Sequence, residues 1–195
     1  MELEIPARAM GLLVLGHGAG GDVTAPDLAA VGTAALAVRV GVALVTQPYR
    51  VAGRRSPAPA GRLDEAWVAV CQALPVGTGR SARRLPLIVG GRSSGARVAC
   101  RTAGTVGAAG VVALAFPLHP PGRPERDRSF ELSTGLPTLV VNGDRDPFGI
   151  PEPAGDREVH VIPGARHDLR RDPAAVASAV VDWLYRHGWA ARVRP

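Results

Sequence analysis

The sequence predicts an α/β fold with a doubly wound, mostly parallel sheet, and three observations lead to this prediction. Short apolar runs rich in β-branched residues recur along the chain, and segments with helical spacing of apolar residues lie between most of them. Most of the runs are continuous rather than alternating, which is typical of strands buried on both faces. Glycine-rich or polar loops follow the runs, as they do where parallel sheets bind ligands. At 195 residues and 46% hydrophobic, the chain can bury a core, and we expect a single domain over residues 1–195.

The first part of the chain is predicted to contribute an edge strand, two buried strands and two helices. The edge strand alternates charged and apolar residues, whereas the buried strands are unbroken apolar runs. A segment rich in Pro, Gly and Arg precedes the second helix, and we expect a loop at the rim of a site there. In order, we expect a strand at residues 2–5, a strand at 10–15, a helix at 24–38, a strand at 42–46, the loop at 47–62 and a helix at 63–74.

The second part of the chain is predicted to continue this alternation. A Gly/Arg-rich loop leads into it, its strands are again short apolar runs, and its last helix begins near a proline suited to the first helical turn. In order, we expect a strand at residues 85–89, a helix that includes 95–99, a strand at 110–116, a polar loop at 117–128, one helical turn within 130–136, strands at 137–141 and 158–162, and a helix at 173–187.

A sharp turn with a serine at its apex follows the strand at residues 85–89. The sequence Gly91-Arg92-Ser93-Ser94-Gly95 has the pattern G-x-S-x-G, which is typical of a strained strand-to-helix turn that exposes a nucleophilic serine. So tight a turn brings the residues two before and two after the serine almost into contact, which favours glycine at both places. The pattern also occurs in ordinary turns, but here a strand precedes it and a helix follows it, as a nucleophile requires. We therefore predict that Ser93 is a nucleophile.

The glycine-rich loop at residues 16–21 follows the first buried strand. Backbone N–H groups in such a loop can converge on an anion, so the loop is either a phosphate cradle or an oxyanion hole. The G-K-[S/T] ending of a phosphate-binding loop is missing, and the dinucleotide spacing G-x-G-x-x-G is not met cleanly. We therefore favour an oxyanion hole formed by the N–H groups of Ala19 and Ser94, with Gly18 as the alternative to Ala19.

An acid and a base that could serve the serine follow later strands. A serine nucleophile needs a base and a carboxylate that orients the base, and in a fold of this kind the chain order is serine, acid, histidine. Asp146 follows the strand at residues 137–141, and His167 follows the strand at residues 158–162. Asp144 in the same loop is an alternative acid. We favour Asp146 because the turn at Gly143 can direct the later carboxylate back toward the sheet edge.

The other histidines near these loops fit the position of the base less well. His160 lies within a predicted strand, and His17 and His119 lie off the expected position of the base. His17 and His119 remain candidates for contacts with a substrate, together with Gly18 and Arg92.

The charge pattern argues against a nucleic-acid partner. The net charge is +6, but all 23 basic residues are arginines scattered along the chain, and aromatic residues make up only 4%. Nucleic-acid surfaces usually combine a basic stripe with aromatic side chains. The arginines Arg54, Arg55 and Arg92 could favour an anionic substrate, although ordinary surface solvation is the simpler interpretation.

Neither a metal nor an organic cofactor is expected. The two cysteines, Cys71 and Cys100, fall in segments with helical spacing, so we expect buried free thiols rather than a disulfide or a metal site. No apolar stretch is long enough to cross a bilayer, and residues 1–8 lack the features of a signal peptide. We therefore expect a cytoplasmic location and no membrane partner.

Five longer segments are more specific than the serine pattern: GHGAGGD, TQPYRVAGRRSPAP, GGRSSGARVAC, FPLHPPGRPERDR and VVNGDRDPFG. Together they resemble a small α/β-hydrolase family that includes a testis-expressed protein and the hydrolase-like domain of a chromatin acetyltransferase complex subunit, and that is distantly similar to dienelactone hydrolases. The resemblance covers nearly the whole chain. It implies a minimal α/β-hydrolase fold without a lid domain, with Ser93 as nucleophile, Asp146 as acid and His167 as base. Dienelactone hydrolases carry a cysteine where this chain has Ser93, so their particular activity is not implied.

These observations predict a serine hydrolase, of the carboxylesterase or thioesterase kind, that acts on a small-molecule ester or thioester. The alternative is a catalytically silent interaction module with the same fold, because the family that the chain resembles includes scaffold-like members. A silent relic usually loses a member of its catalytic set, whereas this chain keeps all three residues and the glycine-rich loop. We therefore favour the enzyme. No pattern in the sequence predicts the acyl length, the leaving group or the oligomeric state.

Overall fold

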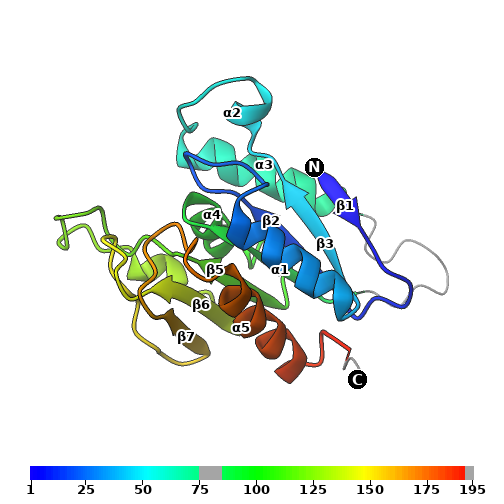
Figure 1. Cartoon of the computed structure of the whole chain (residues 1–195). Coiled ribbons are helices and arrows are strands. Elements are labelled where there is room, and N and C mark those ends of the chain that lie inside the picture. Colours follow the sequence, from blue (N-terminus) through cyan, green and yellow to red (C-terminus); the bar gives the residue numbers. More distant parts are fainter. Residues whose placement is uncertain (75–84, 192–195) are drawn as a thin grey trace.

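The computed structural model describes residues 1–74 and 85–191 and contains one seven-stranded sheet (Figure 1). The strands are β1 (Glu2–Glu4), β2 (Gly11–Gly16), β3 (Val40–Val45), β4 (Leu87–Arg92), β5 (Gly110–Leu114), β6 (Thr138–Gly143) and β7 (Arg157–Ile162). Their order across the sheet is β1-β3-β2-β4-β5-β6-β7. The short strand β1 pairs antiparallel with β3, and the other pairs are parallel.

Helices cover both faces of the sheet (Figure 1). They are α1 (Pro26–Ala37), α2 (Pro48–Val51), α3 (Ala60–Gln72), α4 (Ser94–Thr102), α5 (Pro173–Arg186) and the 3-10 helix η1 (Ser129–Leu132). Helices α1 and α5 pack side by side on one face, and α3 and α4 pack together on the other. This arrangement confirms the predicted α/β fold with a doubly wound, mostly parallel sheet.

Strand β2 shows why the apolar runs of the sequence are continuous. Leu12 and Val14 belong to the core beneath α3 and α4, whereas Leu13 and Leu15 belong to the core beneath α1 and α5. All four side chains are fully buried. Because successive side chains of a strand point to opposite faces, a strand covered on both faces needs apolar residues at every position.

Every predicted strand and helix that falls within the described residues is present, with ends shifted by a few residues. The expected loop at residues 47–62 needs correction, because it contains the four-residue helix α2 and the first turn of α3. Pro48 suits the first position of α2, but so short a helix leaves no periodic apolar pattern to detect. Strand β4, which precedes the turn at Ser93, begins at Leu87 rather than at residue 85. The expected Gly/Arg-rich loop at residues 75–84 lies outside the described residues.

The parallel strands bring four chain segments to one edge of the sheet. Gly16 at the end of β2 pairs with Gly91 near the end of β4, and Gly143 at the end of β6 pairs with Ile162 at the end of β7. The loops that follow these strands therefore meet at the carboxyl edge, where ligands bind in open α/β sheets. Over residues 1–74 and 85–191, no helix combines the length and apolarity needed to cross a bilayer.

Candidate active site

Ser93 lies at the turn between β4 and α4 in a backbone conformation that few residues with a side chain adopt. Its φ is 53° and its ψ is −110°. Conformations of this kind cost about 1–3 kcal/mol and are kept where the surrounding structure enforces them. The predicted strain at the apex of the turn is therefore present.

Two glycines allow the chain to make this turn. A Cβ atom on Gly91 would lie 2.9 Å from the Gly95 carbonyl carbon and 2.4 Å from the Gly16 oxygen, and one on Gly95 would lie 2.3 Å from the same oxygen. No side chain fits either place, because each of these contacts is with backbone. The close approach predicted across the serine is confirmed, and the end of β2 takes part in it.

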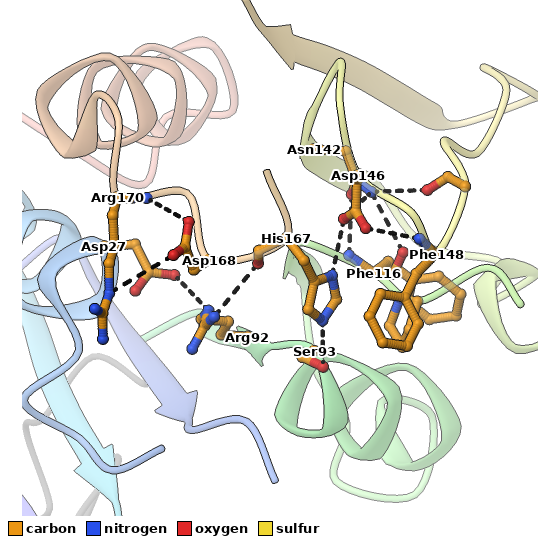
Figure 2. A network of polar contacts seen from close by, with 12 residues as sticks. Asp27, Arg92, Ser93, Phe116, Asn142, Asp146, Phe148, His167, Asp168 and Arg170 are labelled. Atoms are coloured by element: carbon orange, nitrogen blue, oxygen red, sulfur yellow. Dashed lines mark hydrogen bonds and ion pairs between the residues drawn. The ribbon is translucent and has the colours of Figure 1, made fainter. Parts of the chain in front are cut away.

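Three side chains from three separate loops form one polar chain (Figure 2). Ser93 Oγ lies 2.9 Å from His167 Nε2, and His167 Nδ1 lies 2.8 Å from Asp146 Oδ2. The Asp146 side chain is fully buried, whereas that of His167 is 19% exposed. A carboxylate only accepts hydrogen bonds, so His167 donates from Nδ1, and its neutral Nε2 can accept the Ser93 hydroxyl proton.

The carboxylate of Asp146 is held on both oxygens. The backbone N–H of Phe148 donates to Oδ1 at 2.9 Å, and the Asn142 amide donates to Oδ2 at 3.3 Å. The Phe148 ring also lies against the His167 imidazole, with ring centroids 4.1 Å apart (Figure 2). Asp144 is exposed, and the hydrogen bond to His167 comes from Asp146. Of the two aspartates considered, the structure therefore brings Asp146 to the histidine.

In the loop after β2, the carbonyl groups of Gly18 and Ala19 accept hydrogen bonds from within the protein. The Gly18 carbonyl accepts hydrogen bonds from His17 Nδ1 at 2.8 Å and from the Gly21 N–H at 3.2 Å, and the Ala19 carbonyl accepts from the Tyr49 hydroxyl at 2.9 Å. Among the described residues, the backbone N–H groups of Ala19 and Ser94 donate to no acceptor. Both residues line the recess that contains Ser93. These N–H groups are available to an anion in that recess.

Known proteins share this architecture. The model of the family described as "Alpha/beta hydrolase domain" matches residues 9–179 of the chain. The chain belongs to this family. No curated protein sequence matches the chain.

Solved structures with low sequence identity have the same fold. Dienelactone hydrolase from Anabaena variabilis is 20% identical, with a TM-score of 0.74 over 97% of this chain and 91% of that one. Est1E from Butyrivibrio proteoclasticus, solved with ferulic acid bound, is 15% identical, with a TM-score of 0.71 over 95% and 93%. A serine hydrolase without a lid from Xanthomonas campestris is 16% identical, with a TM-score of 0.71 over 98% and 89%. The predicted minimal α/β-hydrolase fold is confirmed.

His17, predicted as a substrate contact, is instead a buried residue in the loop after β2. Its side chain has no exposed surface, and its Nε2 accepts a hydrogen bond from the Gln47 N–H at 3.0 Å. Burial lowers the pKa of the imidazole below its ordinary value, which favours the neutral ring. The prediction of direct contact is wrong because the side chain is buried and both ring nitrogens are hydrogen-bonded within the protein, Nδ1 to the adjacent Gly18 carbonyl and Nε2 to the Gln47 N–H after β3. Gly18 does lie beside the serine, since a Cβ there would be 3.4 Å from Ser93 Cβ.

Arg92 points away from the Ser93 recess toward a neighbouring one. Its Nε forms an ion pair with Asp27 Oδ2 at 3.4 Å, and its Nη2 donates to the His167 carbonyl at 3.4 Å (Figure 2). It lines a second recess of about 500 Å³ together with Arg145, Arg166 and His167. Arg92 therefore lies next to His167 in the second recess and is not part of the lining of the recess that contains Ser93.

His119 packs between two loops at the other side of the site. Its N–H donates to the Phe148 carbonyl at 3.0 Å, its Nδ1 lies 3.0 Å from the Pro120 carbonyl oxygen, and its Nε2 would be 2.6 Å from a Cβ on Gly149. Within the described residues its side chain makes no hydrogen bond to Ser93 or His167, and it is not part of the lining of the recess that contains Ser93. His119 therefore lies outside the recess of Ser93.

The recess beside Ser93 has a volume of about 350 Å³ and combines an apolar wall with charged side chains. Most of the residues that line it were not predicted from the sequence. Arg97 and Arg101 could have been found, because they are four residues apart on the helix after Ser93 and this spacing indicates a shared face. Apart from Ser93, Ser94 and Ala19, the lining consists of Pro57, Ala58, Ala60, Leu63, Arg97, Arg101, Pro117, Arg128 and Phe148.

The two cysteines are buried and are poor candidates for a nucleophile. Cys71 and Cys100 are free and buried, as predicted, and burial raises the pKa of each thiol to about 12. Thiols with so high a pKa stay protonated and are poor nucleophiles. Across the two described stretches of chain, no three His, Cys, Asp or Glu side chains gather closely enough to hold a metal ion.

Proposed function

We propose that the chain is a serine hydrolase that cleaves a small carboxylic ester or thioester, with Ser93 as nucleophile, His167 as base and Asp146 as the acid that orients it. One observation carries the proposal: contacts of 2.9 Å and 2.8 Å link the serine hydroxyl through the imidazole to a buried carboxylate. Such a chain activates a serine, which is otherwise a weak nucleophile at neutral pH.

In the first half of the reaction, Ser93 Oγ forms a bond to the carbonyl carbon while its proton moves to His167 Nε2. The tetrahedral intermediate then breaks its bond to the leaving oxygen or sulfur, and His167 returns the proton to that atom. Asp146 keeps the imidazole in the required tautomer and stabilises its positive charge.

The backbone N–H groups of Ala19 and Ser94 are proposed to bind the oxyanion of this intermediate. Each is free of other acceptors among the described residues and lines the recess of Ser93. One donor of this kind contributes about 3 kcal/mol to the stability of the transition state. Gly18 stays the alternative to Ala19, since it is next in the chain and close to Ser93.

In the second half of the reaction, water takes the place of the leaving group. His167 accepts a proton from the water as it attacks the acyl-enzyme, and the proton then passes to Ser93 Oγ as the acid product leaves. A recess of about 350 Å³ suits a small acyl group rather than a long lipid chain.

The alternative, a silent interaction module, is less well supported because a relic has no need to keep Asp146 buried and hydrogen-bonded on both oxygens. Membership of the smaller family with the testis-expressed and chromatin-associated hydrolase-like proteins rests on the five sequence segments and stays a prediction. The single domain over residues 1–195, the cytoplasmic location and the absence of a nucleic-acid partner also stay predictions.

The test is labelling with a neutral fluorophosphonate probe, which reacts with an activated serine and requires no knowledge of the substrate. We expect the wild type to be labelled, and we expect labelling to be lost in Ser93→Ala and in His167→Ala. Ser178→Ala on the exposed side of α5 is the matched control and should label like the wild type. A folded wild type that stays unlabelled would overturn the proposal in favour of the interaction module.

A further inference from the structure

Three arginines line the recess of Ser93. Arg97 and Arg101 project from α4, the helix that begins directly after the nucleophile, and Arg128 ends the loop that follows β5. The wall that completes the recess is apolar, with Leu63 and Phe148 among its members. Apart from the two serines and the backbone N–H groups of Ala19 and Ser94, the polar character of the recess therefore comes from guanidinium groups.

Two of the three guanidinium groups are neutralised by buried or half-buried carboxylates. Arg97 forms a bidentate pair with Glu131 at 2.6 and 2.8 Å, and Arg101 forms one with Asp64 at 2.6 and 2.9 Å. Arg101 also contacts both oxygens of Glu131 at 3.4 Å. The side chain of Glu131 is only 4% exposed, and among the described residues both of its ion pairs are with these two arginines.

Arg128 is the third cation and has no carboxylate of its own. Within the described residues it forms no ion pair, and its side chain makes one hydrogen bond, from Nη1 to the Pro117 carbonyl at 3.2 Å. The cluster of three arginines and two carboxylates thus keeps one uncompensated positive charge. Partial burial, with the nearby charge of Arg97 as a smaller cause, lowers the pKa of Arg128 from its ordinary value, and the charge of Glu131 opposes this shift only in part. A bound anion would oppose the shift as well.

The part of the substrate that enters this recess follows from the position of the proposed oxyanion donors. The recess is lined by Ser93 and by Ala19 and Ser94, whose N–H groups are proposed to bind the carbonyl oxygen of the acyl group. The acyl group is therefore placed in the recess of Ser93 and Arg128.

We infer that the chain hydrolyses esters or thioesters whose short acyl group carries a carboxylate, and that Arg128 is the residue that binds this carboxylate. A guanidinium presents a planar fork of donors that matches a carboxylate, and the apolar wall accommodates the methylene groups between the two ends of the acyl chain. The inference rests on the proposed function and adds the substrate class to it.

The test compares methyl hydrogen glutarate with its neutral analogue dimethyl glutarate, by the rate of methanol release. We expect a higher kcat/KM for the hemiester, after correction for the two equivalent ester groups of the diester. In Arg128→Met we expect the ratio of the two kcat/KM values to fall about 10- to 100-fold, the loss typical of one charged hydrogen-bonded pair. Arg128→Lys keeps the charge without the fork and should give an intermediate ratio.

The matched control is Arg126→Met, which removes an exposed arginine of the same loop that lies outside the recess and should leave the ratio unchanged. Circular dichroism and the Tm check that each variant is folded. A ratio that favours the diester, or one that is the same in wild type and Arg128→Met, would overturn the inference. Fluorophosphonate labelling separates the two proposals, because a labelled wild type without hemiester preference refutes only the substrate class, whereas an unlabelled one refutes the hydrolase itself.

Discussion

At the scale of single residues, Asp146 does more than balance a charge. Its buried carboxylate accepts from His167, from the Phe148 N–H and from Asn142, so each oxygen has a fixed direction. Asn142 is itself fixed, because its Oδ1 accepts from the Phe116 N–H at 2.9 Å and its Nδ2 donates to the Gly149 carbonyl at 3.1 Å. The orientation of the imidazole is therefore set by a network that reaches from the end of β5 to the loop after β6.

Substitution Asp146→Asn tests this network. The amide can present a donor to His167 Nδ1, which favours the wrong tautomer and places a proton on Nε2, where the base must be free. We expect the rate of fluorophosphonate labelling to fall by about 10⁴-fold, as in serine enzymes that lose this carboxylate. Asp144→Asn, in the same loop but exposed, is the control and should label at the wild-type rate. Equal rates for both variants would remove Asp146 from the proposed mechanism.

At the scale of elements, the sequence alone predicts which loops meet, because this depends on where each parallel strand ends. The loops that carry Ser93, Asp146 and His167 meet because parallel strands share a carboxyl edge, and each loop is recognisable from the apolar run before it. The burial of His17 could not be predicted in this way. It depends on a hydrogen bond to Gln47, which is 30 residues away along the chain.

His17 joins two elements, and this junction predicts how stability depends on pH. Burial lowers its pKa in the folded state below the ordinary value of 6.5, so the unfolded chain binds the proton more readily. Its contribution to stability is therefore present above pH 6.5 and is lost as the pH falls below it. A protonated Nε2 would also repel the Gln47 N–H, which it accepts in the neutral form.

We expect His17→Gln to lower the free energy of unfolding at about pH 7.5 by about 1–2 kcal/mol, because it disrupts one of two buried hydrogen bonds. We also expect the stability of His17→Gln to decrease less than that of the wild type as the pH falls from about 7.5 to about 5.5. Urea unfolding at both pH values measures this difference. His160→Gln, on the exposed side of β7, should keep the wild-type decrease. The same decrease in His17→Gln would show that this imidazole is not the titrating group.

At the scale of the whole molecule, one ion pair connects the helix layer to the candidate active site. Asp27 on α1 has no exposed surface and pairs with Arg92 at the end of β4, which in turn donates to the carbonyl of His167 (Figure 2). Asp27 and Arg92 are 65 positions apart along the chain, and Arg92 and His167 are 75 positions apart. No local pattern in the sequence therefore indicates that they meet. The same reason explains why the cluster of Arg97, Arg101 and Glu131 was not predicted.

Removal of the Arg92 side chain should therefore lower the free energy of unfolding by an amount that depends on pH. Burial raises the pKa of Asp27, and the Arg92 charge opposes this rise, so in Arg92→Met the folded-state pKa of Asp27 lies higher still. A buried carboxylate without its partner costs about 3 kcal/mol of stability at neutral pH. Protonation of Asp27 favours the folded state, so this cost decreases as the pH falls through the raised pKa.

Urea unfolding of wild type and Arg92→Met at about pH 7.5 and about pH 5 measures the cost at each pH. We expect a smaller difference between the two proteins at the lower pH. The double variant Asp27→Asn with Arg92→Met carries no buried charge at this place, so we expect it to recover part of the stability at about pH 7.5. A cost that is the same at both pH values, and that Asp27→Asn does not relieve, would mean that the packing of the Arg92 side chain, rather than its charge, stabilises this junction.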